Sequence, residues 1–310
     1  MHAGGQGFWV GRMAAELGAQ PRVCAPVGGR SGALLPELMR LDGVDVVPVP
    51  CHRSRAVWVS TGRDGEPATV GATEPPPLDR HEVDGLYSAT LAAGLAAGTA
   101  VLTGPPRLGI LPVDVYRRLA RDLSANGAGV IADVGMEALE PTLAGGIDVL
   151  KVSDEDLIQA GRLRERALEG VLEAIADLRA LGARAVVVSR AADPVVADAG
   201  GEALEVVSPT LEELNRRGAG DAMTGALAAG LARGMPLREA VRLAVAAGTL
   251  NVTRRGLGTG QRRAIEELAG VVRLRRVDPV AAGPGLAAPE PRSGRPHQGS
   301  GRSSSASSRP

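Results

Sequence analysis

Residues 215–225 read NRRGAGDAMTG, and this stretch places glycines directly before a helical pattern of Ala226, Leu227 and Leu231. Glycine lets a backbone come close to a ligand, and the first N–H groups of a helix have no acceptor inside the helix. An anion can accept those hydrogen bonds. The stretch therefore predicts an anion site at residues 218–220, which are Gly218, Ala219 and Gly220.

Asp221 follows the glycines at once. A carboxylate beside a bound phosphoryl group can act as a general base, taking the proton of an attacking hydroxyl as the new phosphorus–oxygen bond forms. The stretch alone also fits a second interpretation, in which Asp221 caps the helix and the glycines make a tight turn. The downstream sequence favours the first, because another helix begins at Met235-Pro236-Leu237 and leads into AVAAGTLNVTRRGLGTG, residues 244–260.

Upstream, short β-branched runs alternate with helical patterns. Several runs are continuously apolar, as strands buried on both faces must be. This order predicts right-handed βαβ crossovers and a mostly parallel sheet covered on both faces, with ligands bound beyond the carboxyl ends of its strands. The expected strands are 44–49, 56–61, 100–103, 130–134, 148–152, 185–189 and 195–199.

Two segments depart from this alternation. Residues 44–73 hold two strand-like runs and a turn at 63–66 without a helix, which predicts a small hairpin or β-flap on the main sheet. From residue 279 to 310 the chain is rich in Gly, Pro, Ser and Arg without hydrophobic period, which predicts a disordered tail. We therefore expect one α/β domain over residues 1–278.

Composition narrows the function. The 310 residues carry 35 basic and 35 acidic side chains, which gives no electrostatic footprint for nucleic acids or acidic membranes. Two Trp, two Tyr and one Phe supply few stacking platforms for bases. We expect a small neutral or phosphorylated ligand instead.

Cysteines and histidines indicate neither disulfides nor metal. Cys24 and Cys51 lie too far apart for a metal-ligand motif, and the four histidines form no cluster. No apolar run reaches the roughly 18 residues of a membrane span, and the first residues do not resemble an export signal. We expect a soluble cytoplasmic protein.

The two C-terminal motifs resemble the signature of the PfkB, or ribokinase-like, sugar kinases, and are most similar to the 1-phosphofructokinase branch. The run Ala3-Gly4-Gly5-Gln6-Gly7 before an apolar helix is similar to that family's N-terminal glycine motif. The similarity extends over residues 3–278. The resemblance implies an αβα sandwich with a small β-lid, ATP as phosphoryl donor with Mg²⁺, a sugar or sugar-phosphate acceptor, and pairing of two copies through the lid.

The resemblance also assigns roles to single residues. Asp221 matches the catalytic base, and residues 218–220 match the anion hole. Gly4 and Gly5 match the sugar site, and Arg55 matches a lid residue that recognises a substrate phosphate. On the nucleotide side, Asp156 matches a magnesium-shell acid, Asp133 matches an aspartate near the transfer cleft, and the nucleotide contacts are Lys151, Ser189, Asn251 and Gly256.

The chain departs from the family pattern at several places. The sequence begins almost at the glycine motif, so we expect either that its start is misassigned or truncated or that sugar binding is compromised, because the family's first strand carries a sugar-binding aspartate. Trp9 stands where a sugar-contacting Asn is usual. Ser153 and Asp156 replace Asn and Glu in the magnesium motif. These changes leave a second hypothesis open, a non-catalytic pseudokinase that binds sugar or nucleotide. A dinucleotide-dependent oxidoreductase is disfavoured because neither glycine run reads G-x-G-x-x-G.

Overall fold

The computed structural model describes residues 2–53, 57–60, 69–104, 109–254 and 256–277. Its central sheet has seven strands in the order β11-β10-β9-β8-β7-β6-β5. β5 to β8 are parallel, whereas β9, β10 and β11 each pair antiparallel with the preceding strand. The strands are β5 Thr99–Thr103, β6 Gly129–Asp133, β7 Ile147–Ser153, β8 Ala183–Arg190, β9 Asp193–Asp198, β10 Ala203–Val207 and β11 Arg273–Arg276.

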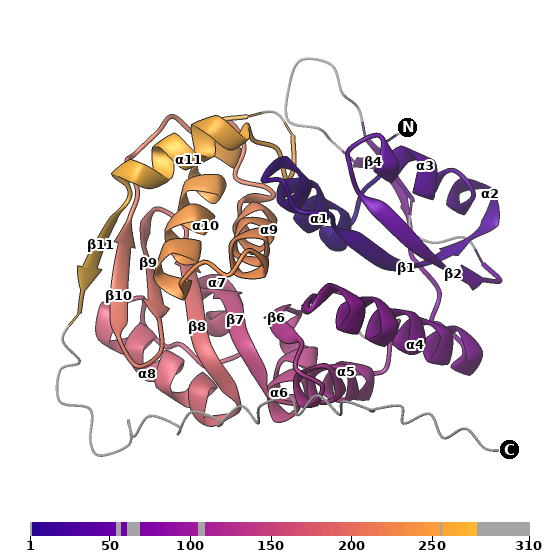
Figure 1. The fold of residues 1–310 in the computed structure, drawn as a ribbon, viewed down its shortest axis with the longest axis horizontal. Coiled ribbons are helices and arrows are strands. Elements are labelled where there is room, and N and C mark those ends of the chain that lie inside the picture. The colour runs from indigo at the N-terminus through magenta and orange to yellow at the C-terminus, as the bar shows by residue number, and fades with distance from the viewer. Residues whose placement is uncertain (1, 54–56, 61–68, 105–108, 255, 278–310) are drawn as a thin grey trace, which may run out of the picture.

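Helices cover both faces of this sheet, as the apolar strands require (Figure 1). One buried cluster lies under α4 (Arg80–Ala97), α5 (Asp114–Ala125), α6 (Met136–Ala144), α7 (Asp154–Gln159) and α8 (Leu168–Ala180). A second lies under α1 (Gln6–Glu16), α9 (Ala219–Ala232), α10 (Leu237–Asn251) and α11 (Arg262–Val271). The expected αβα sandwich is confirmed.

The N-terminal part of the chain adds two small sheets. β1 (Arg22–Gly28) pairs in parallel with β2 (Asp45–Cys51), and the short helices α2 (Gly29–Gly32) and α3 (Leu35–Arg40) connect them. β3 (Val57–Ser60) and β4 (Thr69–Thr73) form an antiparallel pair. Among the described residues no ladder joins β1 to β5, so the β1–β2 sheet stands apart from the main sheet.

The structure corrects the expected flap over residues 44–73. Its first run, β2, pairs with β1 and not with the second run, so the hairpin is β3 with β4. β1 was missed because Pro26 and Gly28 interrupt an otherwise apolar run, and both residues are unfavourable in isolated strand patterns. The predicted turn at 63–66 and the tail from 279 lie outside the described residues.

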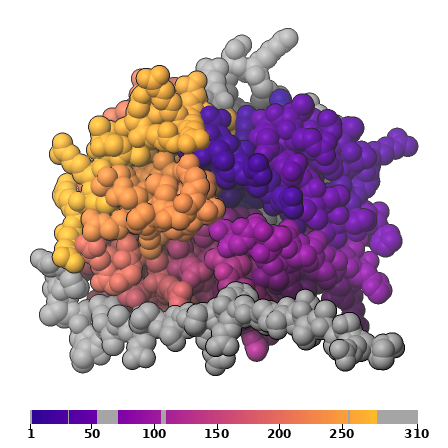
Figure 2. Space-filling model, viewed as in Figure 1, coloured from indigo at the N-terminus to yellow at the C-terminus, as the bar shows by residue number. Residues whose placement is uncertain are grey.

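α1 connects the two regions. It packs against α9 on one side and also contacts β1, and in Figure 2 the indigo atoms of the first residues lie beside the orange atoms of the C-terminal region. Among the described residues, no helix has the combination of length and apolarity that a membrane crossing needs.

Candidate active site

The N-terminus of α9 forms the centre of the site. Gly218 adopts a left-handed conformation with φ of 78° and serves as the N-cap, so the chain turns sharply into the helix. The amides of Gly218, Gly220 and Asp221 find no acceptor among the described residues, while the amide of Ala219 donates over a long 3.4 Å to the carbonyl of Arg216. This end of α9 therefore has donors to spare for an anion.

Lys151 reaches the same point from the carboxyl end of β7. Its side chain is buried, and a Cβ added to Gly220 would lie 2.6 Å from its Nζ atom, so the end of Lys151 would have to shift if residue 220 had a side chain. An ammonium beside the positive end of a helix dipole is electrostatically unfavourable unless an anion lies between them. Asp133 supplies one negative charge, and the free amides of α9 together with Lys151 can bind a further anion such as a phosphoryl group.

Asp133, at the end of β6, holds Lys151 in place. Lys151 Nζ lies 3.3 Å from Asp133 Oδ2, and the hydroxyl of Thr224 donates to the same oxygen at 2.6 Å. Thr224 is fully buried on α9, one helical turn after Gly220. The two strand ends and the helix N-terminus are thus joined through one carboxylate.

Asp221 lies in the first turn of α9 and makes no hydrogen bond or ion pair through its side chain to a described residue. Burial raises its pKa to about 6, the nearby charge of Asp133 adds to this, and Lys151 acts in the opposite direction. A carboxylate with a pKa near 6 is ionised at neutral pH and is still basic enough to accept a proton from an attacking group.

The glycine motif at the N-terminus meets the same edge of the sheet. Gly5, with φ of 109°, is the N-cap of α1, and Gly4 lies beside the ring of Trp9. Gln6 donates to the carbonyl of Asp133 at 3.1 Å and accepts the amide of Gly104 at 2.9 Å. Sequence reasoning missed Gln6, although an amide between glycines at a helix start is a signal for such a bridge.

The residues fit a Mg²⁺ ion only when other ligands complete its shell. Asp156 is exposed; one of its oxygens accepts the hydroxyl of Ser153 at 2.5 Å, and the Ser153 hydroxyl also accepts the amide of Asp156 at 3.1 Å. The other carboxylate oxygen remains for an ion, through water or directly. Among the described residues the one cluster of three potential metal ligands is His52, Asp79 and Glu82 at the start of α4.

The other predicted residues are placed as follows. Ser189 pairs in register with Ser153, so the ends of β7 and β8 lie together, and Gly256 begins a loop whose Leu257 contacts Gly218. Asn251 is completely buried at the end of α10. Arg55 lies outside the described residues.

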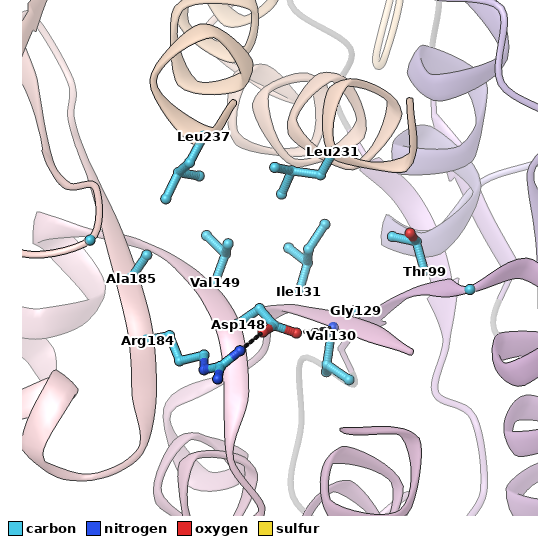
Figure 3. A pocket seen from close by; sticks show the side chains of 12 residues that line it. Thr99, Gly129, Val130, Ile131, Asp148, Val149, Arg184, Ala185, Leu231 and Leu237 are labelled. Atoms are coloured by element: carbon cyan, nitrogen blue, oxygen red, sulfur yellow. Dashed lines mark hydrogen bonds and ion pairs between the residues drawn. The ribbon is translucent and has the colours of Figure 1, made fainter. Parts of the chain in front are cut away.

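A separate cavity of about 430 Å³ lies at the other end of the sheet, lined by the amino ends of β5 to β8. Apolar side chains of Ile131, Val149, Leu231 and Leu237 point into it (Figure 3). Asp148 and Arg184 form an ion pair of 3.1 Å on its rim. Because no set of polar groups converges inside it, we assign this cavity no chemistry.

Known proteins resemble this chain over most of its length. The family described as "pfkB family carbohydrate kinase" matches residues 1–263. A 1-phosphofructokinase of Rhodobacter capsulatus is 30% identical over 79% of this chain and 78% of its own, and ATP-dependent 6-phosphofructokinase isozyme 2 of Escherichia coli is 28% identical over 82% of each. The crystal structure of phosphofructokinase-2 from E. coli in complex with potassium superposes with a TM-score of 0.75 at 26% identity, over 86% of this chain and 87% of that one.

Proposed function

The chain belongs to the pfkB family of carbohydrate kinases, and from this premise we propose that it transfers the γ-phosphoryl group of ATP to a hydroxyl of a sugar or sugar phosphate. Relatives named 1-phosphofructokinase and 6-phosphofructokinase support a phosphorylated sugar as the acceptor. We propose the 1-phosphofructokinase type of reaction as the starting point for assays.

One observation carries the proposal. The Asp221 carboxylate has a raised pKa and makes no hydrogen bond or ion pair to a described residue. It lies in the same helical turn as the free amides and near the ammonium of Lys151. This combination provides a base and an anion-binding site within a few atoms of each other, which is what phosphoryl transfer to an alcohol needs.

The proposed reaction uses these groups in one step. Asp221 takes the proton of the acceptor hydroxyl as its oxygen forms a bond to the γ-phosphorus, while the bond between that phosphorus and the ADP oxygen breaks. The amides of Gly218 and Gly220 and the ammonium of Lys151 would hold the oxygens of the transferred group, on which negative charge spreads. Catalysis then comes from positioning and electrostatics in a site shielded from water.

We propose that the remaining site residues serve the two substrates. Asp156 would contribute to the shell of a Mg²⁺ ion that neutralises the ATP phosphates, and Ser189 and Gly256 would line the nucleotide side. Gly4 and Gly5 would face the sugar. Arg55 would recognise a substrate phosphate, because a guanidinium presents a rigid fork of donors.

The boundaries and assembly also belong to this proposal. We propose that the kinase domain extends to residue 278, shortly after the last strand β11. Two copies would pair through the lid formed by β3 and β4. A kinase that uses ATP would work in the cytoplasm.

A second candidate is a pseudokinase that binds its ligands without transferring phosphate. The separation of the β1–β2 sheet from β5 favours it. The glycine motif at the start of α1 contacts both β1 and β5, so its position is fixed less firmly when no ladder joins these two strands. The hydrogen bond from Ser153 to Asp156 also occupies half of the candidate magnesium ligand.

One assay separates the two candidates. The full chain is incubated with ATP, Mg²⁺ and a panel of sugars and sugar phosphates, and ADP and phosphorylated product are measured together. We expect product with at least one sugar phosphate, and a drop of about 10³-fold in turnover for Asp221→Ala with ATP affinity nearly unchanged. ATP binding without product from any acceptor would favour the pseudokinase, and full turnover by the variant would remove Asp221 from the mechanism.

A further inference from the structure

Asn251 is a completely buried polar side chain at the end of α10, and both ends of its amide are used. Its Nδ2 donates to the carbonyl of Arg217 at 3.0 Å, and its Oδ1 accepts the amide of Thr259 at 3.3 Å. No part of the side chain is open to a ligand in this conformation. The role in nucleotide contact that the family resemblance suggests is therefore not one that this geometry supports.

The first partner of Asn251 leads directly to the anion site. Arg217 precedes Gly218, the N-cap of α9, so its carbonyl fixes where the free amides begin. The next residue, Val252, adds to this hold, because its carbonyl accepts the amides of Leu214 at 2.8 Å and Asn215 at 3.0 Å. The end of α10 thus holds residues 214–217, the segment that leads into α9.

The second partner, Thr259, belongs to the loop 256–260, which lies between the N-terminus of α9 and the helix α1. A Cβ on Gly218 would lie 3.0 to 3.2 Å from atoms of Leu257, so this loop is packed directly against the α9 N-cap. A Cβ on Gly258, whose φ is 61°, would lie 2.4 Å from the carbonyl oxygen of Trp9 on α1. One loop therefore touches both the phosphate side and the helix that carries the glycine motif.

We infer that Asn251 is a positioning residue, which holds the segment before α9 and the loop 256–260 in one arrangement and so fixes where the free amides and Asp221 lie relative to the sugar-side helix α1. The inference rests on the proposed phosphoryl transfer, since this arrangement decides whether an acceptor hydroxyl lies in line with the transferred group. A misplacement of about 1 Å in such a site can lower the rate about 100-fold. Asn251 would achieve this through the hydrogen bonds of its side chain to the backbone of Arg217 and Thr259.

Kinetics of four forms test the inference: wild type, Asn251→Leu, Asn251→Asp and Thr249→Val. Leucine has the same branching and a somewhat larger volume, and it leaves the carbonyl of Arg217 and the amide of Thr259 unpaired. We expect its kcat to fall about 10- to 100-fold with KM for ATP changed less than about threefold. Thr249→Val is the matched control, because Thr249 lies on the same helix and its 2.7 Å hydrogen bond to Ser208 leads to neither loop; we expect its kcat to stay within about twofold of wild type.

The aspartate variant separates positioning from general folding. A protonated aspartic acid can donate to the carbonyl of Arg217 and accept from the amide of Thr259, as the asparagine does, whereas the ionised form cannot donate. The activity of Asn251→Asp relative to wild type should therefore recover as pH falls, and a ratio that does not change with pH would contradict the inference. An unchanged kcat with a raised KM for ATP in Asn251→Leu would overturn it in favour of a direct nucleotide contact.

A measurement that needs no activity keeps this test apart from that of the proposed function. Amide hydrogen exchange followed by mass spectrometry should be faster at residues 214–222 and 256–260 in Asn251→Leu than in Thr249→Val or wild type. Unchanged exchange in a folded variant would refute the positioning role even if no acceptor sugar is found. If Asn251→Leu does not fold, Gly258→Ala replaces it, because the new Cβ would push the loop 256–260 away from α1. We then expect Gly258→Ala to lower kcat with little change in KM for ATP. A normal kcat for this variant would refute the inference.

Discussion

Replacing Asp221 with asparagine should make the protein more stable while it lowers the rate of the reaction to a small residual value. The reason is that burial, with help from Asp133, raises the pKa of Asp221 from 3.8 to about 6. The folded state therefore holds the proton more tightly than the unfolded state does. The ionised carboxylate destabilises the fold fully above pH 6, and this destabilisation disappears below the unfolded pKa of 3.8.

The size of the effect follows from the same pKa values. Each unit of pKa difference between folded and unfolded states corresponds to about 1.4 kcal/mol, so ionised Asp221 costs the folded state on the order of 3 kcal/mol at pH 8. Asparagine has nearly the same shape, and the Asp221 side chain makes no hydrogen bond to a described residue that would be lost. For a chain of this size, we expect a rise in Tm of roughly 4 to 10 °C at pH 8.

Thermal unfolding followed by circular dichroism at pH 8 and at pH 4 measures this effect. The matched control is Asp156→Asn, since Asp156 lies at the same position in the first turn of α7 but is exposed and hydrogen-bonded to Ser153. We expect a gain for Asp221→Asn at pH 8 that shrinks toward pH 4, and no gain for the control. A loss of stability at pH 8, or an equal gain at both pH values, would refute the burial of a charged Asp221.

Two further changes probe the surroundings of Asp221, and a third tests the turn between β8 and β9. Gly220→Ala should lower kcat about 10- to 100-fold with little change in Tm, because the new Cβ would displace the flexible end of Lys151. The control is Gly270→Ala on α11, whose Cβ would meet no atom within 4 Å and should leave kcat unchanged. Equal kcat values for the two variants would contradict the role of Lys151 at the anion site. Lys151→Met removes the charge that lowers the pKa of Asp221, so the acid limb of the pH–kcat/KM profile should move to higher pH, and an unmoved limb would exclude this coupling. Ala191→Gly relieves a φ of 35° in the β8–β9 turn and should raise the free energy of unfolding by about 0.5 to 1 kcal/mol in urea titrations; a loss would show that the turn is not strained.

Local patterns sufficed for β5 to β9, which are short apolar runs buried in the main sheet, but β10 and β11 were not predicted. β11 reads Arg-Leu-Arg-Arg and is mostly exposed, so it carries no apolar run. The expected strand at 130–134 appears as β6 over 129–133, and that at 148–152 as β7 over 147–153. In the β1–β2 sheet only the strand at 44–49 was expected, and it appears as β2 over 45–51. β1 was missed because Pro26 and Gly28 interrupt its apolar run.

For the site, the sequence predicted the position of the groups but not their connections. The glycines and Asp221 could be located because a helix N-terminus leaves a local signature. The links from Asp133 to Thr224, and from Gln6 to the carbonyl of Asp133, depend on which strand ends meet and span 91 and 127 residues. For Asn251 the motif match suggested a nucleotide contact, but it could not reveal that both ends of the side-chain amide are hydrogen-bonded inside the fold.

The pH dependence of kcat/KM in wild type and Asp221→Asn tests the central claim most directly. If Asp221 removes the proton of the acceptor, kcat/KM for wild type should rise tenfold per pH unit below an apparent pKa of about 6 and then level off, as its pKa requires. The asparagine variant should show only a low residual rate without that limb. The same acid limb in both proteins would mean that another group accepts the proton.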